Sequence, residues 1–184
     1  HAMAERGTRD QWIIQGHIGS TWQDGQYVRT RDMEKVRPAF EDLLARLETA
    51  HVELGMIHYV DDVDEFRGIM EGPFIEYVRH LHAAGTIGHV GLSTHNPDVA
   101  ALAASCGEVE MIMFSVNPAF DLLPATASLD DAFTFAYDDA LEGMDPTRAE
   151  LYALCEREGV GLTVMKGYAG GRLFDAATSP FGVA

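Results

Sequence analysis

The sequence contains few cysteines, few basic residues and no long apolar run, and each shortage excludes a class of protein. The two cysteines, Cys106 and Cys155, have no Cys-x-x-Cys spacing, which favours buried thiols in a reducing compartment over a disulfide framework. The 13 basic residues are outnumbered by 29 acidic ones, and a net charge of −16 argues against a nucleic-acid or membrane partner. No signal peptide or membrane span is visible, so we expect a cytoplasmic protein.

What the chain does contain is a series of short apolar runs separated by amphipathic stretches. Its 184 residues are 47% apolar, which is enough for a single globular domain over residues 1–184. The clearest run, 52–57, ends in His58 and then acidic residues. We expect strands at 12–18, 52–58, 87–93, 109–116 and 161–165. Alternation of strands with helices predicts an α/β fold with a parallel sheet.

Capping signals place several of the intervening helices. Asp32 is a plausible N-cap for a helix that starts near Met33, although Pro38 should distort it. A helix from residue 73 to 84 ends at Gly85, and Asn96 with Pro97 opens the next one. Residues 20–31, rich in Gly, Gln and Asp, read as a polar loop.

Polar side chains stand at the predicted carboxyl end of every strand. In parallel α/β folds these ends meet at one edge of the sheet, where binding and catalysis gather. Five polar ends in register are hard to explain by packing alone, although each histidine taken singly is more often structural. The residues are His17, His58, Ser93 with Thr94 and His95, Asn117, and Lys166.

Several chemistries fit this set. A neutral histidine can donate a hydrogen bond to a carbonyl oxygen. Ser93 and Asn117 can bind an amide, and the turn with Gly170, Gly171 and Arg172 offers donors to a phosphate. The rival is a metal hydrolase in which three histidines, His17, His58 and His95, bind zinc, but no motif spacing supports a metal site.

Four stretches resemble the aldo/keto reductases, and more closely those predicted oxidoreductases of the superfamily that often carry a C-terminal iron–sulfur segment. The stretches are 40–47 (FEDLLARL), 54–58 (LGMIH), 85–97 (GTIGHVGLSTHNP) and 164–173 (VMKGYAGGRL). The resemblance implies a (β/α)8 TIM barrel, of which this chain would supply about strands 3 to 7 with their helices. It also implies NADP(H) or NAD(H) as cofactor, and a 4Fe-4S cluster would lie outside this chain.

The resemblance also assigns roles to individual residues. It places His58 at the family's catalytic histidine, and Ser93 with Thr94 where the nicotinamide carboxamide is held. The segment against the cofactor pyrophosphate would contain Lys166, Gly170, Gly171, Arg172 and Leu173.

The departures from the family pattern are equally specific. His17 stands where the family has its catalytic lysine, and a histidine is a poor substitute for a fixed cation. Met113 and Met165 replace the family's glutamine and tyrosine that contact nicotinamide. The stretches that would carry the catalytic aspartate and tyrosine, the eighth strand and the cluster's cysteines are not among these residues.

The sequence therefore predicts a nicotinamide-dependent oxidoreductase that acts on a small carbonyl compound or alcohol, with His58 and His17 as catalytic residues. The alternative is a barrel protein that has lost the reductase tetrad. We expect the chain to be a segment of a larger barrel, inactive in isolation and self-associating through its unclosed edges.

Overall fold

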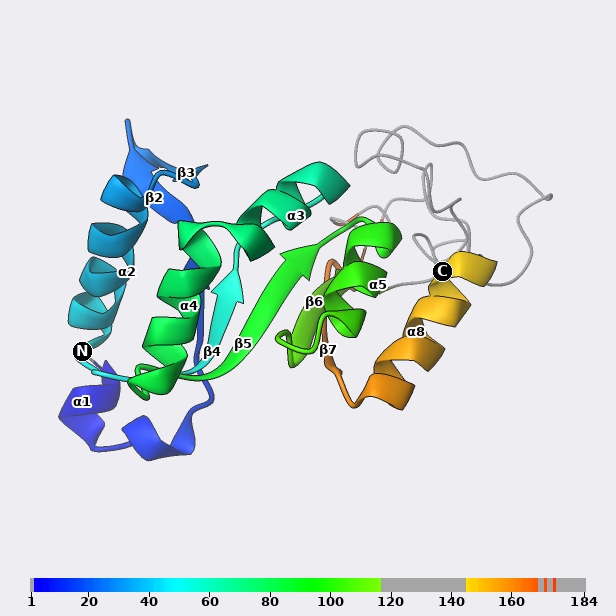
Figure 1. Cartoon of the computed structure of the whole chain (residues 1–184). Coiled ribbons are helices and arrows are strands. Elements are labelled where there is room, and N and C mark those ends of the chain that lie inside the picture. The colour runs from blue at the N-terminus through cyan, green and yellow to red at the C-terminus, as the bar shows by residue number, and fades with distance from the viewer. Residues whose placement is uncertain (1, 117–144, 169–170, 172–173, 175–184) are drawn as a thin grey trace.

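The computed structural model describes residues 2–116, 145–168, 171 and 174, and its centre is a parallel sheet of five strands (Figure 1). The strands lie in the order β1-β4-β5-β6-β7, and each pair of neighbours is parallel. Their bounds are β1 Gln15–Ile18, β4 Val52–Ile57, β5 Ile87–Thr94, β6 Met111–Ser115 and β7 Gly161–Met165. The predicted α/β class and parallel sheet are confirmed.

The helices cover one face of this sheet (Figure 1). They are α2 Met33–Leu47, α3 Val63–Glu71, α4 Pro73–Ala83, α5 Pro97–Ser105 and α8 Pro146–Glu158. A short helix, α1 Ala2–Arg6, and a 3-10 turn, Arg9–Gln11, precede β1 and are not part of this layer. The hydrophobic core lies between helices and sheet, where Phe40 of α2 and strand residues such as Ile18 and Ile57 are almost fully buried. The opposite face of the sheet carries the alternate residues, including His17, Met56 and Gly91, which pair in register.

The predicted helix caps are confirmed. The Asp32 carboxylate accepts a hydrogen bond from the Glu34 N–H at 3.1 Å, and the Asn96 side chain accepts one from the Asp98 N–H at 2.8 Å. Gly85 follows α4 with a positive φ of 71°, as a glycine at the end of a helix should. Helix α2 begins at Met33 as expected and continues through Pro38, which lies on its exposed side.

Two expectations near the N-terminus are wrong. The first strand begins at Gln15 and not at residue 12, and Trp12 and Ile13 are 55% and 79% exposed, since neither side chain reaches the core. The segment read as a polar loop is a β-hairpin made of β2, Ser20–Gln23, and β3, Gln26–Arg29. Asp24 and Gly25 both have positive φ, the geometry of a two-residue hairpin turn.

Candidate active site

The two histidines of the predicted site lie together at the carboxyl end of the sheet. His17 belongs to β1 and His58 directly follows β4, and the His58 N–H donates to the Ile18 carbonyl at 2.8 Å, continuing the pairing of these strands. The two rings are 4.7 Å apart between centroids and tilted by 49°. The sheet register therefore builds this pair from residues 41 positions apart in the sequence.

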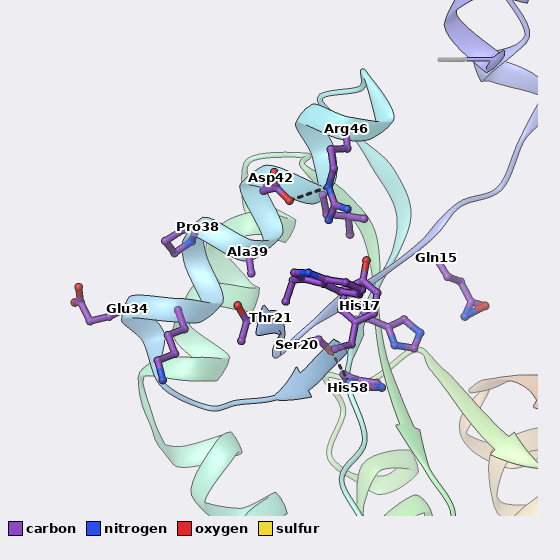
Figure 2. A pocket seen from close by; sticks show the side chains of 14 residues that line it. Gln15, His17, Ser20, Thr21, Glu34, Pro38, Ala39, Asp42, Arg46 and His58 are labelled. Carbon is purple, nitrogen blue, oxygen red and sulfur yellow. Dashed lines mark hydrogen bonds and ion pairs between the residues drawn. The ribbon is translucent and has the colours of Figure 1, made fainter. Parts of the chain in front are cut away.

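The hairpin adds a hydroxyl group that sequence reasoning missed. The Ser20 Oγ lies 2.5 Å from the His58 Nδ1, and Figure 2 shows the two side chains joined beside His17. Ser20 is the first residue of β2 and follows Gly19, whose φ of 102° turns the chain out of β1. The Asp-Gly turn signal at Asp24 and Gly25 was the one hint that residues near Ser20 are ordered.

Two arginines of the hairpin segment hold the backbone around His58. Arg31 Nη2 donates to the carbonyl oxygens of His58 and Tyr59 at 2.7 and 2.9 Å, and Arg29 Nη1 donates to the Tyr59 carbonyl at 2.9 Å. Both guanidinium groups also pair with the Glu65 carboxylate of α3, at 3.0 and 3.2 Å. These contacts support Tyr59 in a left-handed conformation with a φ of 52°, which is costly for a residue other than glycine.

Burial and nearby positive charge keep the histidine pair neutral. Burial, and then the charges of His17, Arg31, Arg29 and His95, lower the pKa of His58 from 6.5 to about 4. Burial also lowers the pKa of His17. At neutral pH both rings can donate or accept hydrogen bonds, but neither supplies the fixed positive charge of a lysine.

A second histidine group lies beside the first. The Asp61 Oδ2 lies 2.9 Å from His95 Nδ1, while its Oδ1 accepts hydrogen bonds from the His95 N–H and the Thr94 hydroxyl. Burial alone would raise the pKa of Asp61, but these bonds outweigh it and lower the pKa, so Asp61 is a carboxylate and Nδ1 of His95 carries the hydrogen. The ring packs edge-on against Tyr59, with centroids 5.2 Å apart.

The residues expected to hold a nicotinamide carboxamide are engaged within the protein. The Ser93 hydroxyl accepts a hydrogen bond from the Tyr59 N–H at 2.8 Å, and Ser93 is 4% exposed. Thr94 is fully buried, and its hydroxyl accepts a hydrogen bond from the Asn96 N–H at 3.0 Å in addition to its bond to Asp61. Both residues therefore shape the ends of β4 and β5, and their part in cofactor binding stays a prediction.

Only part of the predicted phosphate segment falls within the described residues. Lys166 follows β7 with a φ of 55°, and burial lowers the pKa of its ammonium, partly offset by the charge of Asp61. Gly171 has a φ of 95°, and its N–H donates to the Tyr168 carbonyl at 2.9 Å. Asn117, Gly170, Arg172 and Leu173 lie outside the described residues, so their assigned roles stay predictions.

Among the buried polar atoms that have no hydrogen-bond partner in the described residues, three lie on or just after β5, β6 and β7. They are His95 Nε2 after β5, Ser115 Oγ at the end of β6 and Thr163 Oγ1 in β7. Unsatisfied buried polar atoms are rare in proteins because each one costs free energy. The three atoms lie on or just after neighbouring strands of the sheet. A bound molecule with amide or hydroxyl groups can supply the hydrogen bonds that they lack.

The metal alternative finds no support in residues 2–116, 145–168, 171 and 174. Within them, no three His, Cys, Asp or Glu side chains form a group that could hold a metal ion. His17 and His58 lie together, but His95 is turned to Asp61.

A pocket of about 630 Å3 adjoins the histidine pair. Figure 2 shows His17, Ser20 and His58 together in its wall. Helix α2 contributes Pro38, Ala39 and Asp42 to the same wall. Trp22 and Tyr27 of the hairpin complete the wall with rings packed edge to face, and they are 60% and 61% exposed. The pocket is large enough for a small organic molecule with an apolar part.

A parallel sheet with helices on one face and polar strand ends has the architecture of a section of a (β/α)8 barrel. The Aldo/keto reductase family model matches residues 1–183, and the chain belongs to that family. No curated protein sequence matches the chain.

Solved structures show the same fold. Aldo-keto reductase AKR11C1 from Bacillus halodurans, in its holo form, is 21% identical with a TM-score of 0.61, over 88% of this chain and 45% of that one. A candidate aldo-keto reductase from Pseudomonas aeruginosa, PA4992, is 24% identical with a TM-score of 0.61, over 86% and 51%. An aldo/keto reductase from Brucella melitensis is 14% identical with a TM-score of 0.55, over 90% and 52%. The chain spans about half the length of these proteins.

In the part of the chain that the structure describes, every helix is too short or too polar to cross a bilayer.

Proposed function

We propose that this chain carries part of the active site of a nicotinamide-dependent oxidoreductase, which reduces a carbonyl compound or oxidises the corresponding alcohol. One observation carries the proposal. In a chain of the aldo/keto reductase family, His58 is neutral, lies at the carboxyl end of a parallel strand and adjoins a pocket of about 630 Å3. A neutral imidazole at that place is a hydrogen-bond donor for a carbonyl oxygen that gains negative charge during reduction.

The chemistry of the proposed reaction divides between the cofactor and this chain. When bound, the nicotinamide supplies or accepts the hydride. His58 orients the carbonyl oxygen with an N–H donor. His17, whose ring centroid lies 4.7 Å from that of His58, relays a proton to or from that oxygen. Trp22 and Tyr27 shield the apolar part of the substrate from water.

The residues present fit an amide-bearing cofactor ring. His95 Nε2, Ser115 Oγ and Thr163 Oγ1 are buried polar atoms without a partner among the described residues, and a carboxamide offers both hydrogen-bond donors and an acceptor to such atoms. We propose that Ser93, Thr94 and Asn117 border the carboxamide. The segment from Lys166 to Leu173, with Gly170, Gly171 and Arg172, would border the pyrophosphate. An iron–sulfur cluster in a longer chain stays a prediction from resemblance alone.

Cofactor binding and carbonyl reduction test the proposal directly. The full-length protein that contains this chain is titrated into NADPH and into NADH, nicotinamide fluorescence is followed, and a panel of aliphatic and aromatic aldehydes is then assayed. His58→Gln should abolish reduction with the cofactor affinity unchanged, whereas His80→Gln, which alters an exposed histidine of α4, should leave both unchanged. No fluorescence change with either cofactor together with no aldehyde turnover would count against the function.

A catalytically divergent barrel protein is the second candidate, and the state of His17 favours it. Burial holds that ring neutral where the family carries a lysine, so a tyrosine pKa could not be lowered in the family's manner. This candidate predicts that His58→Ala leaves the biological output of the protein unchanged.

We also propose that copies of the chain associate through the edges of the sheet. Among the described strands β1 and β7 stand at the two ends of the order, and exposed apolar side chains lie at both. They are Trp12 and Ile13 before β1, and Leu162 and Val164 in β7. Sedimentation velocity across a hundredfold range of protein concentration should show a species larger than a monomer, and a constant monomer would contradict the proposal.

A further inference from the structure

Ser20 is the one side chain of the hairpin whose polar atom touches the imidazole of His58. The Ser20 Oγ lies 2.5 Å from His58 Nδ1. Arg31 donates hydrogen bonds to the carbonyl oxygens of His58 and Tyr59, so the backbone next to the ring is also held. The family resemblance gives no role to this serine, and it stands in a segment whose sequence reads as a polar loop. Its contact is with the nitrogen that faces away from a ligand bound through Nε2.

The direction of this hydrogen bond decides what His58 can do. Nδ1 accepts if the Ser20 hydroxyl donates, and the ring hydrogen then resides on Nε2. In the other tautomer Nδ1 donates to Ser20 Oγ, and the hydroxyl hydrogen has no acceptor among the described residues. In the first arrangement the hydroxyl hydrogen is bonded within the protein and Nε2–H is left for the pocket that Ser20 and His58 both line, whereas in the second the hydroxyl hydrogen has only the pocket.

We propose that Ser20 is a positioning residue that donates its hydroxyl hydrogen to His58 Nδ1, so that Nε2–H is presented as a hydrogen-bond donor to a carbonyl oxygen. This deepens the proposed function and rests on it for the identity of the oxygen. The tautomer itself does not depend on any bound molecule. It rests on the contact between a serine of the hairpin and a histidine that directly follows β4.

The backbone around Ser20 keeps the hydroxyl in place. Gly19 is buried with a φ of 102°, and a Cβ there would lie 2.5 Å from Arg31 Nη1 and 3.2 Å from the Phe74 ring. The Thr30 N–H donates to the Gly19 carbonyl at 2.9 Å, which closes the hairpin segment onto the end of β1. A hydroxyl carried by such a turn loses little conformational freedom when it bonds to the ring, so the bond orients the imidazole effectively.

The ring nitrogens report the tautomer directly. In uniformly 15N-labelled chain, the two ring 15N shifts of His58, assigned by the loss of its signals in His58→Gln, should show the hydrogen mainly on Nε2. Ser20→Ala should lower the ratio of the Nε2–H to the Nδ1–H tautomer about fivefold, the equivalent of about 1 kcal/mol for one hydrogen bond. Ser20→Thr keeps the hydroxyl and should restore the ratio.

A matched control separates positioning from general packing. Thr21→Ala removes the neighbouring hydroxyl, which lines the same pocket without a hydrogen bond to His58, and should leave the tautomer ratio unchanged. A wild-type hydrogen mainly on Nδ1, an unchanged ratio in Ser20→Ala, or an equal change in Thr21→Ala would each overturn the proposal.

Kinetics then tell this proposal apart from the proposed function. If the full-length protein that contains this chain reduces an aldehyde, Ser20→Ala in it should lower kcat with little change in the KM for the nicotinamide cofactor, and Ser20→Thr should recover most of the loss. No loss in Ser20→Ala, or an equal loss in the exposed His80→Gln control, would overturn the positioning role. Absence of all turnover refutes the oxidoreductase, while the 15N shifts still decide the tautomer.

Discussion

Replacing His58 by glutamine should make the chain less sensitive to acid. The folded protein holds the pKa of His58 at about 4, whereas the unfolded chain should have the ordinary value near 6.5. Between these values the unfolded state binds a proton that the folded state does not, so stability falls as the pH is lowered from above 6.5 towards 4. Glutamine cannot bind this proton, and the variant should lose that part of the pH dependence.

The magnitude follows from the two pKa values. A drop from 6.5 to about 4 corresponds to about 3.4 kcal/mol at ~1.36 kcal/mol for each tenfold change in proton affinity. Because His58 is only partly buried, water screens some of the effect, and we reduce the expected loss to about 1.5 kcal/mol at pH 4 and about 1 kcal/mol at pH 5.

Urea unfolding of both proteins at pH values from 7.5 to 4 measures the difference, at two protein concentrations so that association is detected. The quantity compared is the change of stability with pH, because the substitution also removes the bond to Ser20 at every pH. Parallel curves for the two proteins, or a His58 ring that titrates between pH 6 and 7 by NMR, would refute the reasoning.

Three further substitutions test the same region by urea unfolding. Gly19→Ala should lower the free energy of unfolding by about 1–3 kcal/mol, because φ is 102° and a Cβ would lie 2.5 Å from an arginine nitrogen. Gly68→Ala, in open space on α3, should stabilise the chain slightly, and equal effects of the two substitutions would contradict the reasoning. Asp61→Asn should cost about 1.5–3 kcal/mol through its lost charge-assisted hydrogen bonds, with Asp64→Asn, on an exposed carboxylate, near zero. Pro38→Ala should stabilise by about 2 kcal/mol, since alanine restores a helix hydrogen bond, and a destabilised variant would show that the proline is not a defect in α2.

Much of the fold could be predicted because its elements carry local signals. The run at 161–165 became a strand with those bounds, and the Asn96–Pro97 pair opened a helix as expected. Such signals depend on neighbours in sequence, so they survive without knowledge of tertiary contacts. The prediction that the first strand starts at Trp12 was wrong for the opposite reason. An apolar residue beside a strand joins it only if a packing partner exists, and the sequence does not show that partner.

The histidine pair of the site was predictable, but its surroundings were not. Strand order and register bring His17 and His58 together, and the sequence alone predicts both as strand ends. Ser20 was missed because the alternation around Asp24 and Gly25 spans only four residues on each side, too short to outweigh a polar composition. The bond between Asp61 and His95 joins two strand-end loops 34 residues apart, and no spacing rule predicts it.

The position of the hairpin has a consequence for how the active site can change over evolution or by engineering. Residues 17–31 supply the partner ring, the hydroxyl and both guanidinium groups that surround His58, all within one continuous stretch of chain. The strands and core helices contribute mainly the platform on which this stretch rests. Because Glu65 of α3 pairs with both guanidinium groups, a graft of this environment onto a related barrel would need residues 17–31 together with that carboxylate.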